Sequence, residues 1–200
     1  TSFGISNVQF RFGHISILQY SSSILPNILI NKEFISLPNL IIFASFGLWM
    51  LRQLIFNKDL KKIPDLYFYL FFLSIFIFTK FTRFSEFGND VPAHILALFT
   101  IYNFIKFQNI KNSTYKKTIF KKILIFSTFV VLQKIQYLFI TLFPIYLIIK
   151  NKNLVYKNLL IIFCCIFISS TWLIKNFINT SCFIYPSEIT CVKSVSWSPL

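Results

Sequence analysis

Six apolar runs, each close to the length of a membrane-crossing helix, constrain this chain more than any other feature of its sequence. A helix needs about 20 mostly apolar residues to cross the ~30 Å hydrocarbon core of a bilayer. The runs are 38–57, 64–80, 92–107, 119–133, 135–149 and 157–178. The 200 residues are 56% hydrophobic, include 27 Phe and have a mean hydropathy of +0.67, which is more apolar surface than a soluble domain of this size can bury. The sequence therefore predicts an all-α, polytopic transmembrane helix bundle.

The segment 15–30 differs from these runs, because it is polar from Gln19 to Ser23 and is interrupted by Pro26. We expect it to form a short re-entrant or interfacial helix beside the six spans. Residues 1–200 would then be a single transmembrane domain in which 179–200 begin an outer loop. The chain begins without Met or a signal segment, so we interpret it as an internal fragment of a longer membrane protein.

The basic residues are gathered on alternate connections between the apolar runs. Twelve of the 20 are Lys58, Lys61, Lys62, Lys106, Lys111, Lys116, Lys117, Lys121, Lys122, Lys150, Lys152 and Lys157. Short cytoplasmic loops are enriched in Lys and Arg. These connections are therefore predicted to face the cytoplasm, and loop 80–91 and the C-terminal loop to face the other side of the membrane. Because the charges lie between apolar runs and not along a soluble face, no nucleic-acid partner is expected.

The outer loop 80–91 carries Glu86 and Asp90, two of only six acidic residues in the chain. Two neighbouring carboxylates can hold a divalent cation, or one can act as a base while the other orients a substrate. Both are candidate catalytic residues and candidate ligands of a divalent metal ion, the one cofactor that the sequence suggests. The alternative is that Asp90 only caps a helix that begins at Pro92, since the sequence NDVP suits a helix N-terminus.

Cationic residues in the same compartment are candidates for binding phosphate. Arg11 and His14 precede a Ser-rich, half-apolar segment, and an arginine at a membrane surface can donate two hydrogen bonds to a phosphate. Lys134 lies between two runs of only about 15 residues, which are short for a crossing. A lysine at the membrane centre costs about 2.5–3.5 kcal/mol, so a functional partner is expected. The alternatives are headgroup contact for Arg11 and snorkelling to the interface for Lys134.

The four cysteines fall into two pairs. Cys164 and Cys165 are adjacent within an apolar run and are interpreted as packing residues. Cys182 and Cys191 share the outer loop, where they could form a disulfide if the compartment is oxidising. The sequence leaves this pairing open.

Four segments resemble, in order, a family of bacterial polytopic membrane proteins. GISNVQFRFGHISILQYSSSIL resembles the first outer loop of that family, SEFGNDVPAHIL its acidic second-loop motif, and VVLQKIQYLFITLFPIYLI its short helical hairpin. STWLIKNFINTSCFIYPSEI resembles its final motif, with matches at Trp172, Lys175, Asn176, Tyr185 and Pro186. The family looks like a branch of the C-fold glycosyltransferases (GT-C), which use polyprenyl-phosphate sugars as donors. His14 stands where that family usually has an apolar residue, so its role is not carried over.

The resemblance implies an integral membrane glycosyltransferase of a bacterial inner membrane, with a lipid-linked sugar donor, a lipid or glycan acceptor, and membrane lipids around it. Loop 80–91 and the C-terminal loop would then lie in the periplasm. In that class catalytic acids lie on the first and second outer loops. The first of these is expected upstream of Thr1 and is the better candidate for the base, while Glu86 and Asp90 would orient the acceptor or hold a metal ion. The leaving phosphate would be stabilised by cations, for which the candidates are Arg11, Arg83 and Lys134. Tyr185 is a further candidate for substrate binding.

Three alternatives remain open. A transporter or flippase of lipid-linked saccharides would show inverted repeats and charges near the bilayer midplane. A polysaccharide polymerase or ligase would carry large, Arg-rich outer loops. Neither an inverted repeat nor such loops is visible in the sequence. A purely structural membrane subunit is the third alternative.

Overall fold

The computed structural model describes residues 37–57, 63–81, 90–184, 187–192 and 194. The chain divides into two compact units, Ile17–Asn158 and a second unit that combines Thr1–Ser16 with Leu159–Leu200. We call them the bundle unit and the α8 unit and describe each by itself. The described residues form helices, turns and one isolated bridge, so the predicted all-α class is confirmed for them. The segment 15–30, with its expected re-entrant helix, lies outside the described residues.

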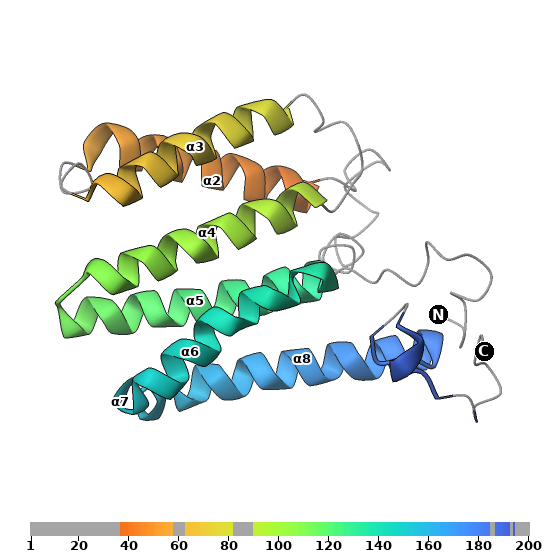
Figure 1. Cartoon of the computed structure of the whole chain (residues 1–200). Helices are drawn as coiled ribbons and strands as arrows, with labels where there is room; N and C mark the ends of the chain where they lie inside the picture. Colours follow the sequence, from red (N-terminus) through yellow and green to blue (C-terminus); the bar gives the residue numbers. More distant parts are fainter. Residues whose placement is uncertain (1–36, 58–62, 82–89, 185–186, 193, 195–200) are drawn as a thin grey trace, which may run out of the picture. The chain divides into compact units, whose positions relative to one another are not determined.

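The bundle unit is a series of helices that run in alternating directions (Figure 1). They are α2 (Leu37–Phe56), α3 (Pro64–Phe81), α4 (Asp90–Asn109), α5 (Ser113–Gln133), the 3₁₀ helix η5 (Ile135–Thr141), α6 (Leu142–Lys150) and α7 (Lys152–Tyr156). Because of this alternation, the connection from α4 to α5 and the end of α6 lie at one end of the bundle. The start of α4 and the turn from α5 to η5 lie at the other end.

Helix α5 begins earlier than its apolar run. It starts at Ser113, where the side chain of Asn112 accepts hydrogen bonds from the backbone N–H groups of Thr114 and Tyr115. The cap satisfies two of the N–H groups that a helix start leaves without partners. α5 therefore has 21 residues and includes part of the lysine-rich segment before the apolar run 119–133.

The following segment is not one regular helix. η5 and α6 together cover Ile135–Lys150, and η5 contains a kink at Tyr137, whose φ of −88° and ψ of 17° are not helical.

An aromatic cluster holds α2, α4 and α5 together in the core of the bundle unit. Trp49 of α2 meets Phe99 and Tyr102 of α4 edge to face, with ring centroids 4.7 and 5.0 Å apart. Phe99 in turn meets Phe126 of α5 at 4.8 Å. Each such contact adds about 0.5–1.5 kcal/mol beyond the burial of apolar area. Leu66, Leu70 and Leu73 of α3 belong to the same buried cluster, which fixes α3 beside α4.

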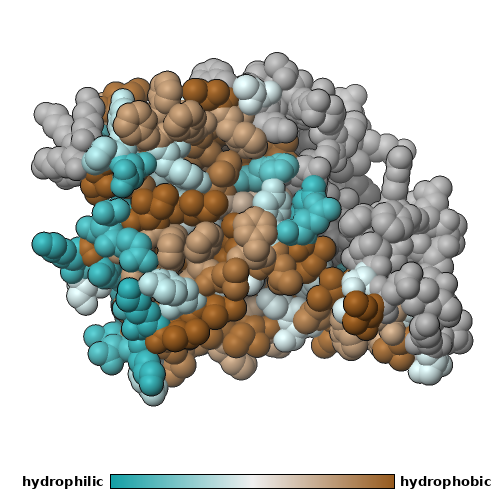
Figure 2. All heavy atoms as spheres, in the orientation of Figure 1, coloured by the Kyte–Doolittle hydropathy of each residue, from teal (hydrophilic) through white to brown (hydrophobic). Residues whose placement is uncertain are grey.

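Much of the surface of the helices is apolar. Figure 2 shows hydrophobic residues along the helices of the bundle unit, while hydrophilic residues gather at the end that contains the α4–α5 connection. Among the described residues, α8 (Leu159–Thr180) is the one helix both long and apolar enough to cross a membrane. Three shorter apolar stretches are Ile41–Phe56, Pro64–Ile77 and Ile135–Lys150. The other predicted crossings therefore stay a prediction.

The α8 unit ends in a small disulfide-closed loop. The chain leaves α8 through Ser181, whose φ of 61° is in the left-handed region that residues other than Gly rarely adopt. Cys182 and Cys191 then form a disulfide, so the pairing that the sequence left open is made. Backbone hydrogen bonds join Phe183 to Thr190 and Val192 to Ser181 across the loop, which also contains the short 3₁₀ helix η6 (Glu188–Thr190).

Candidate functional site

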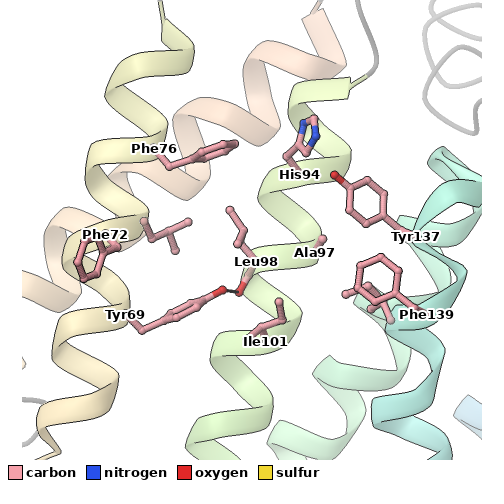
Figure 3. Close-up of a pocket in the computed structure, with 11 residues that line it drawn as sticks. Tyr69, Phe72, Phe76, His94, Ala97, Leu98, Ile101, Tyr137 and Phe139 are labelled. Atoms are coloured by element: carbon pink, nitrogen blue, oxygen red, sulfur yellow. Dashed lines mark hydrogen bonds between the residues drawn. The ribbon is translucent and has the colours of Figure 1, made fainter.

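A pocket of about 380 Å³ lies between α3, α4 and η5 in the bundle unit (Figure 3). Its lining residues are Tyr69, Phe72, Leu73 and Phe76 of α3, His94, Ala97, Leu98 and Ile101 of α4, and Tyr137, Phe139 and Ile140 of η5. Phe72 and Phe139 on its two sides are 66% and 55% exposed, so the pocket opens outward between α3 and η5. Its volume falls within the range of about 300–1,000 Å³ that is usual for ligand sites.

The wall of the pocket is almost entirely apolar. In its inner part, two polar groups of the protein are paired with each other by a hydrogen bond. The hydroxyl of Tyr69 donates to the backbone carbonyl of Leu98 at 2.7 Å. This carbonyl belongs to α4, and the bond ties α3 to α4 across the inner part of the pocket (Figure 3). A ligand in this part of the pocket therefore meets rings and aliphatic side chains.

Polar atoms gather instead at one end of the pocket. There the rings of His94 and Tyr137 meet edge to face with centroids 5.6 Å apart, and Tyr137 directs its hydroxyl toward His94 (Figure 3). Phe76 packs against the imidazole from α3 at 6.0 Å. His94 lies in the second turn of α4, near the end of the bundle where α4 begins. The pocket thus has a long apolar part and one end that can donate and accept hydrogen bonds.

Lys134 is joined to Tyr137 through the backbone, although it does not line the pocket. It is the residue between α5 and η5, where its backbone is extended, with φ −152° and ψ 107°. Its carbonyl accepts a hydrogen bond from the backbone N–H of Tyr137 at 3.0 Å, which starts the 3₁₀ turn that carries Tyr137 into the pocket. The side chain is half-exposed. The structure therefore places the predicted cationic residue within one helical turn of a pocket-lining residue.

The other predicted site residues are described only in part. Asp90 is the first residue of α4, two residues before the predicted start at Pro92, and its side chain lies outside what the structure describes. The remaining predicted residues, Arg11, His14, Arg83, Glu86 and Tyr185, all lie outside the described residues. No group of three or more His, Cys, Asp or Glu residues that could hold a metal ion occurs in the described part of the chain.

Sequence analysis did not single out Tyr69, His94 or Tyr137 as site residues. His94 lies four residues after Asp90, which places both on the same face of α4. This spacing could have identified His94 as a candidate site residue. Tyr137 follows Lys134 by one 3₁₀ turn. Tyr69 offered no signal, because it stands in an apolar run that contains many other aromatic residues.

The described part of the chain is thus an all-α protein with an apolar exterior and an outward-opening pocket. The chain belongs to the family described as "Domain of unknown function (DUF8201)", whose family model matches residues 3–199. No curated protein sequence matches the chain. No solved structure matches it either.

Proposed function

We propose that this chain belongs to an integral membrane glycosyltransferase that moves a sugar from a polyprenyl-phosphate donor to an acceptor at the periplasmic face of a bacterial inner membrane. One observation carries the proposal: an apolar pocket opens outward between helices and has polar groups at one end, on His94 and Tyr137. A polyprenyl-phosphate sugar likewise has a long apolar part and one polar end, because its apolar chain ends in an anionic headgroup. The resemblance to C-fold glycosyltransferases supports the same class.

The membrane arrangement that we propose is a bundle with about six crossings. Helices α2, α4 and α5 have 20, 20 and 21 residues, which corresponds to about 30 Å each. The lysine-rich connection from α4 to α5 and the end of α6 lie at one end of the bundle unit, as the positive-inside rule would require of a cytoplasmic end. The disulfide supports the same orientation, because a disulfide loop after α8 belongs in an oxidising compartment and Lys157, before α8, would then face the cytoplasm.

In this arrangement the pocket would receive the first isoprene units of the donor from the lipid phase. The gap between Phe72 and Phe139 would be the entrance, and the apolar wall would hold the chain by burial of apolar area. The phosphate would then lie near His94 and Lys134, at the depth of the outer headgroups. A lysine there acts as a point charge toward the phosphate.

The reaction proposed is an attack of the acceptor hydroxyl on the anomeric carbon of the donor sugar. A carboxylate of an outer loop would accept the hydroxyl proton as the new glycosidic bond forms. The bond from the anomeric carbon to the phosphate oxygen breaks, and polyprenyl phosphate leaves with an added negative charge. Lys134, with Arg11 and Arg83, would stabilise that charge. Glu86 and Asp90 would orient the acceptor or hold a divalent ion.

The experiment that tests this proposal fills the pocket. The chain is placed in lipid nanodiscs and labelled with a photoreactive polyprenyl phosphate, and the crosslinked peptides are identified by mass spectrometry. We expect labels on α3 and η5 in the parent and their loss in Leu98→Trp, whose indole would occupy the space beside Tyr69. Ile145→Trp is the matched control, because Ile145 is exposed on α6 and does not line the pocket.

Release of polyprenyl phosphate from polyprenyl-phosphate sugars is then measured with the same variants. Release that requires an acceptor and is lost in Leu98→Trp supports the transferase. Labelling of the pocket without any release would overturn the transferase and favour a transporter of lipid-linked saccharides. Unchanged labelling in Leu98→Trp would overturn the assignment of the pocket.

A further inference from the structure

A long part of this chain contains positive charge and no negative charge. Residues 91–187 include 11 lysines and no Asp or Glu. None of these lysines can therefore be neutralised by a carboxylate from the same stretch. Six of them form what we call the α4–α5 lysine cluster: Lys106, Lys111, Lys116, Lys117, Lys121 and Lys122.

The fold brings this cluster together at one end of the bundle unit. Lys106 lies in the last turn of α4, and four of the other lysines lie in the first three turns of α5, just across the connection. Figure 2 shows hydrophilic residues gathered at this end. The first turn of α5 holds no acidic residue, and lysines near a helix start lie toward the positive end of its dipole. The lysines of the cluster repel one another, and an anion that neutralises them must come from outside residues 91–187.

Aromatic rings position part of the cluster. The Nζ atom of Lys106 lies 5.3 Å from the ring centroid of Tyr115 and 5.7 Å from that of Tyr102, so it bridges α5 and α4. The Nζ atom of Lys116 lies 5.3 Å from the ring centroid of Phe107. These cation–π contacts place two ammonium groups on the two sides of the hairpin without neutralising either of them. The cluster is thus partly preorganised.

An apolar surface follows the lysines along α5. Ile125 lies four residues after Lys121, hence on the same side of the helix, and is 38% exposed. The exposed ring of Tyr115 lies on the other side of the charged segment, at the helix start. Positive charges bordered by apolar side chains match a ligand whose anionic headgroup is joined to hydrocarbon.

We propose that the α4–α5 lysine cluster is a binding site for an anionic phospholipid of the cytoplasmic leaflet. The headgroup phosphate would contact the ammonium groups, and an acyl chain would lie along α5 past Ile125. The site is separate from the donor pocket, which lies at the other end of α4, but it relies on the membrane orientation proposed above. The lipid would stabilise the hairpin by supplying the negative charge that residues 91–187 lack.

The test uses the full chain in a neutral detergent, with native mass spectrometry and thermal unfolding as readouts. Phosphatidylglycerol and phosphatidylcholine with identical acyl chains are titrated in parallel. We expect phosphatidylglycerol to bind and to raise the unfolding temperature. A triple variant, Lys117→Gln/Lys121→Gln/Lys122→Gln, should bind it about fivefold more weakly for each lysine replaced. Lys106 and Lys116 are kept in this variant, because their contacts with the rings of Tyr115 and Phe107 join α4 to α5.

Two controls make the assignment specific. Arg at the same three positions should retain binding, and the triple Lys150→Gln/Lys152→Gln/Lys157→Gln should retain most of it. Equal losses in the two Gln triples would overturn the site in favour of a general effect of net charge. Equal binding of both lipids, or the same stabilisation by inorganic phosphate, would overturn the phospholipid. None of these outcomes depends on the donor pocket, whose own test is the Leu98→Trp variant.

Discussion

The imidazole of His94 and the phenol ring of Tyr137 meet edge to face across the pocket, with centroids 5.6 Å apart and planes at 88°. The contact joins α4 to η5 through two residues whose numbers differ by more than forty. Both rings fill the end of the pocket, so the contact contributes to packing. The imidazole nitrogens and the tyrosine hydroxyl can also form hydrogen bonds, so the contact makes this end of the pocket polar. These two contributions can be separated by substitution.

Replacing His94 with Phe keeps a ring of similar size but removes the two nitrogens. We expect the unfolding temperature to change little, because the edge-to-face contact is retained, and the affinity for polyprenyl phosphate to fall about tenfold, the value of one hydrogen bond to a charged group. Binding is measured by microscale thermophoresis on the purified chain. If His94→Phe binds as tightly as the parent, His94 has only a packing role.

Lys134→Met removes the charge of the residue that follows α5 and keeps the length of the side chain. Because insertion becomes easier without a charge, the variant should reach the membrane in normal amounts. It should nevertheless bind polyprenyl phosphate much more weakly than the parent. The matched control is Lys150→Met, which removes a lysine at the opposite end of the bundle and should leave donor binding unchanged. Equal donor affinity of Lys134→Met and the parent would contradict a phosphate contact.

Asp90→Asn tests whether the first residue of α4 acts in the reaction or only starts the helix. Asn and Asp are nearly equivalent as N-terminal capping residues, so the folded yield should be normal. If the carboxylate orients the acceptor or holds a metal ion, transfer activity should be lost. Asp65→Asn, in the first turn of α3, is the control and should keep both yield and activity. A fully active Asp90→Asn enzyme would leave capping as the only role of Asp90.

The disulfide of the α8 unit should stabilise the loop that follows α8. Cys182→Ser/Cys191→Ser is expected to lower the free energy of unfolding of this loop by about 2–4 kcal/mol, because the unfolded loop gains conformational freedom. Limited proteolysis between positions 182 and 191 should therefore be faster in this variant. Cys164→Ser/Cys165→Ser is the control, since neither of those cysteines is in a disulfide. Rapid alkylation of Cys182 in untreated parent protein would show that the loop is reduced.

Tyr69, which is partly buried, and Tyr102, which is buried, should respond differently to loss of their hydroxyl groups. Tyr69 donates its hydroxyl to the carbonyl of Leu98, so Tyr69→Phe should cost about 0.5–1.5 kcal/mol of stability. The buried hydroxyl of Tyr102 has no hydrogen-bond partner among the described residues, so Tyr102→Phe should be neutral or slightly stabilising. Thermal unfolding of the two variants in the same detergent compares them directly. A larger loss in Tyr102→Phe would mean that its hydroxyl binds a group outside the described residues.

The sequence by itself determined which segments are helical, and where most of them begin and end. Apolar runs separated by short polar connections can satisfy their backbone hydrogen bonds only as helices if they meet lipid. The described helices accordingly follow the predicted runs closely, for instance 64–80 against Pro64–Phe81 and 157–178 against Leu159–Thr180. The membrane side of each connection, which the lysine pattern predicts, stays a prediction.

Only the tertiary structure decided which side chains form the pocket. Neighbours such as Phe72, which is largely exposed, and Leu73, which is buried, are equally apolar, so hydropathy cannot tell an outer surface from a pocket wall or a core. The 3₁₀ geometry of η5, which turns Tyr137 toward His94, depends on how α4 and α5 pack against it. The early start of α5 depends on a local cap by Asn112, which outweighs the unfavourable lysines that follow. The pocket wall and the geometry of η5 depend on contacts between segments, and the start of α5 depends on one capping side chain. The pattern of apolar residues along the chain contains no information on either.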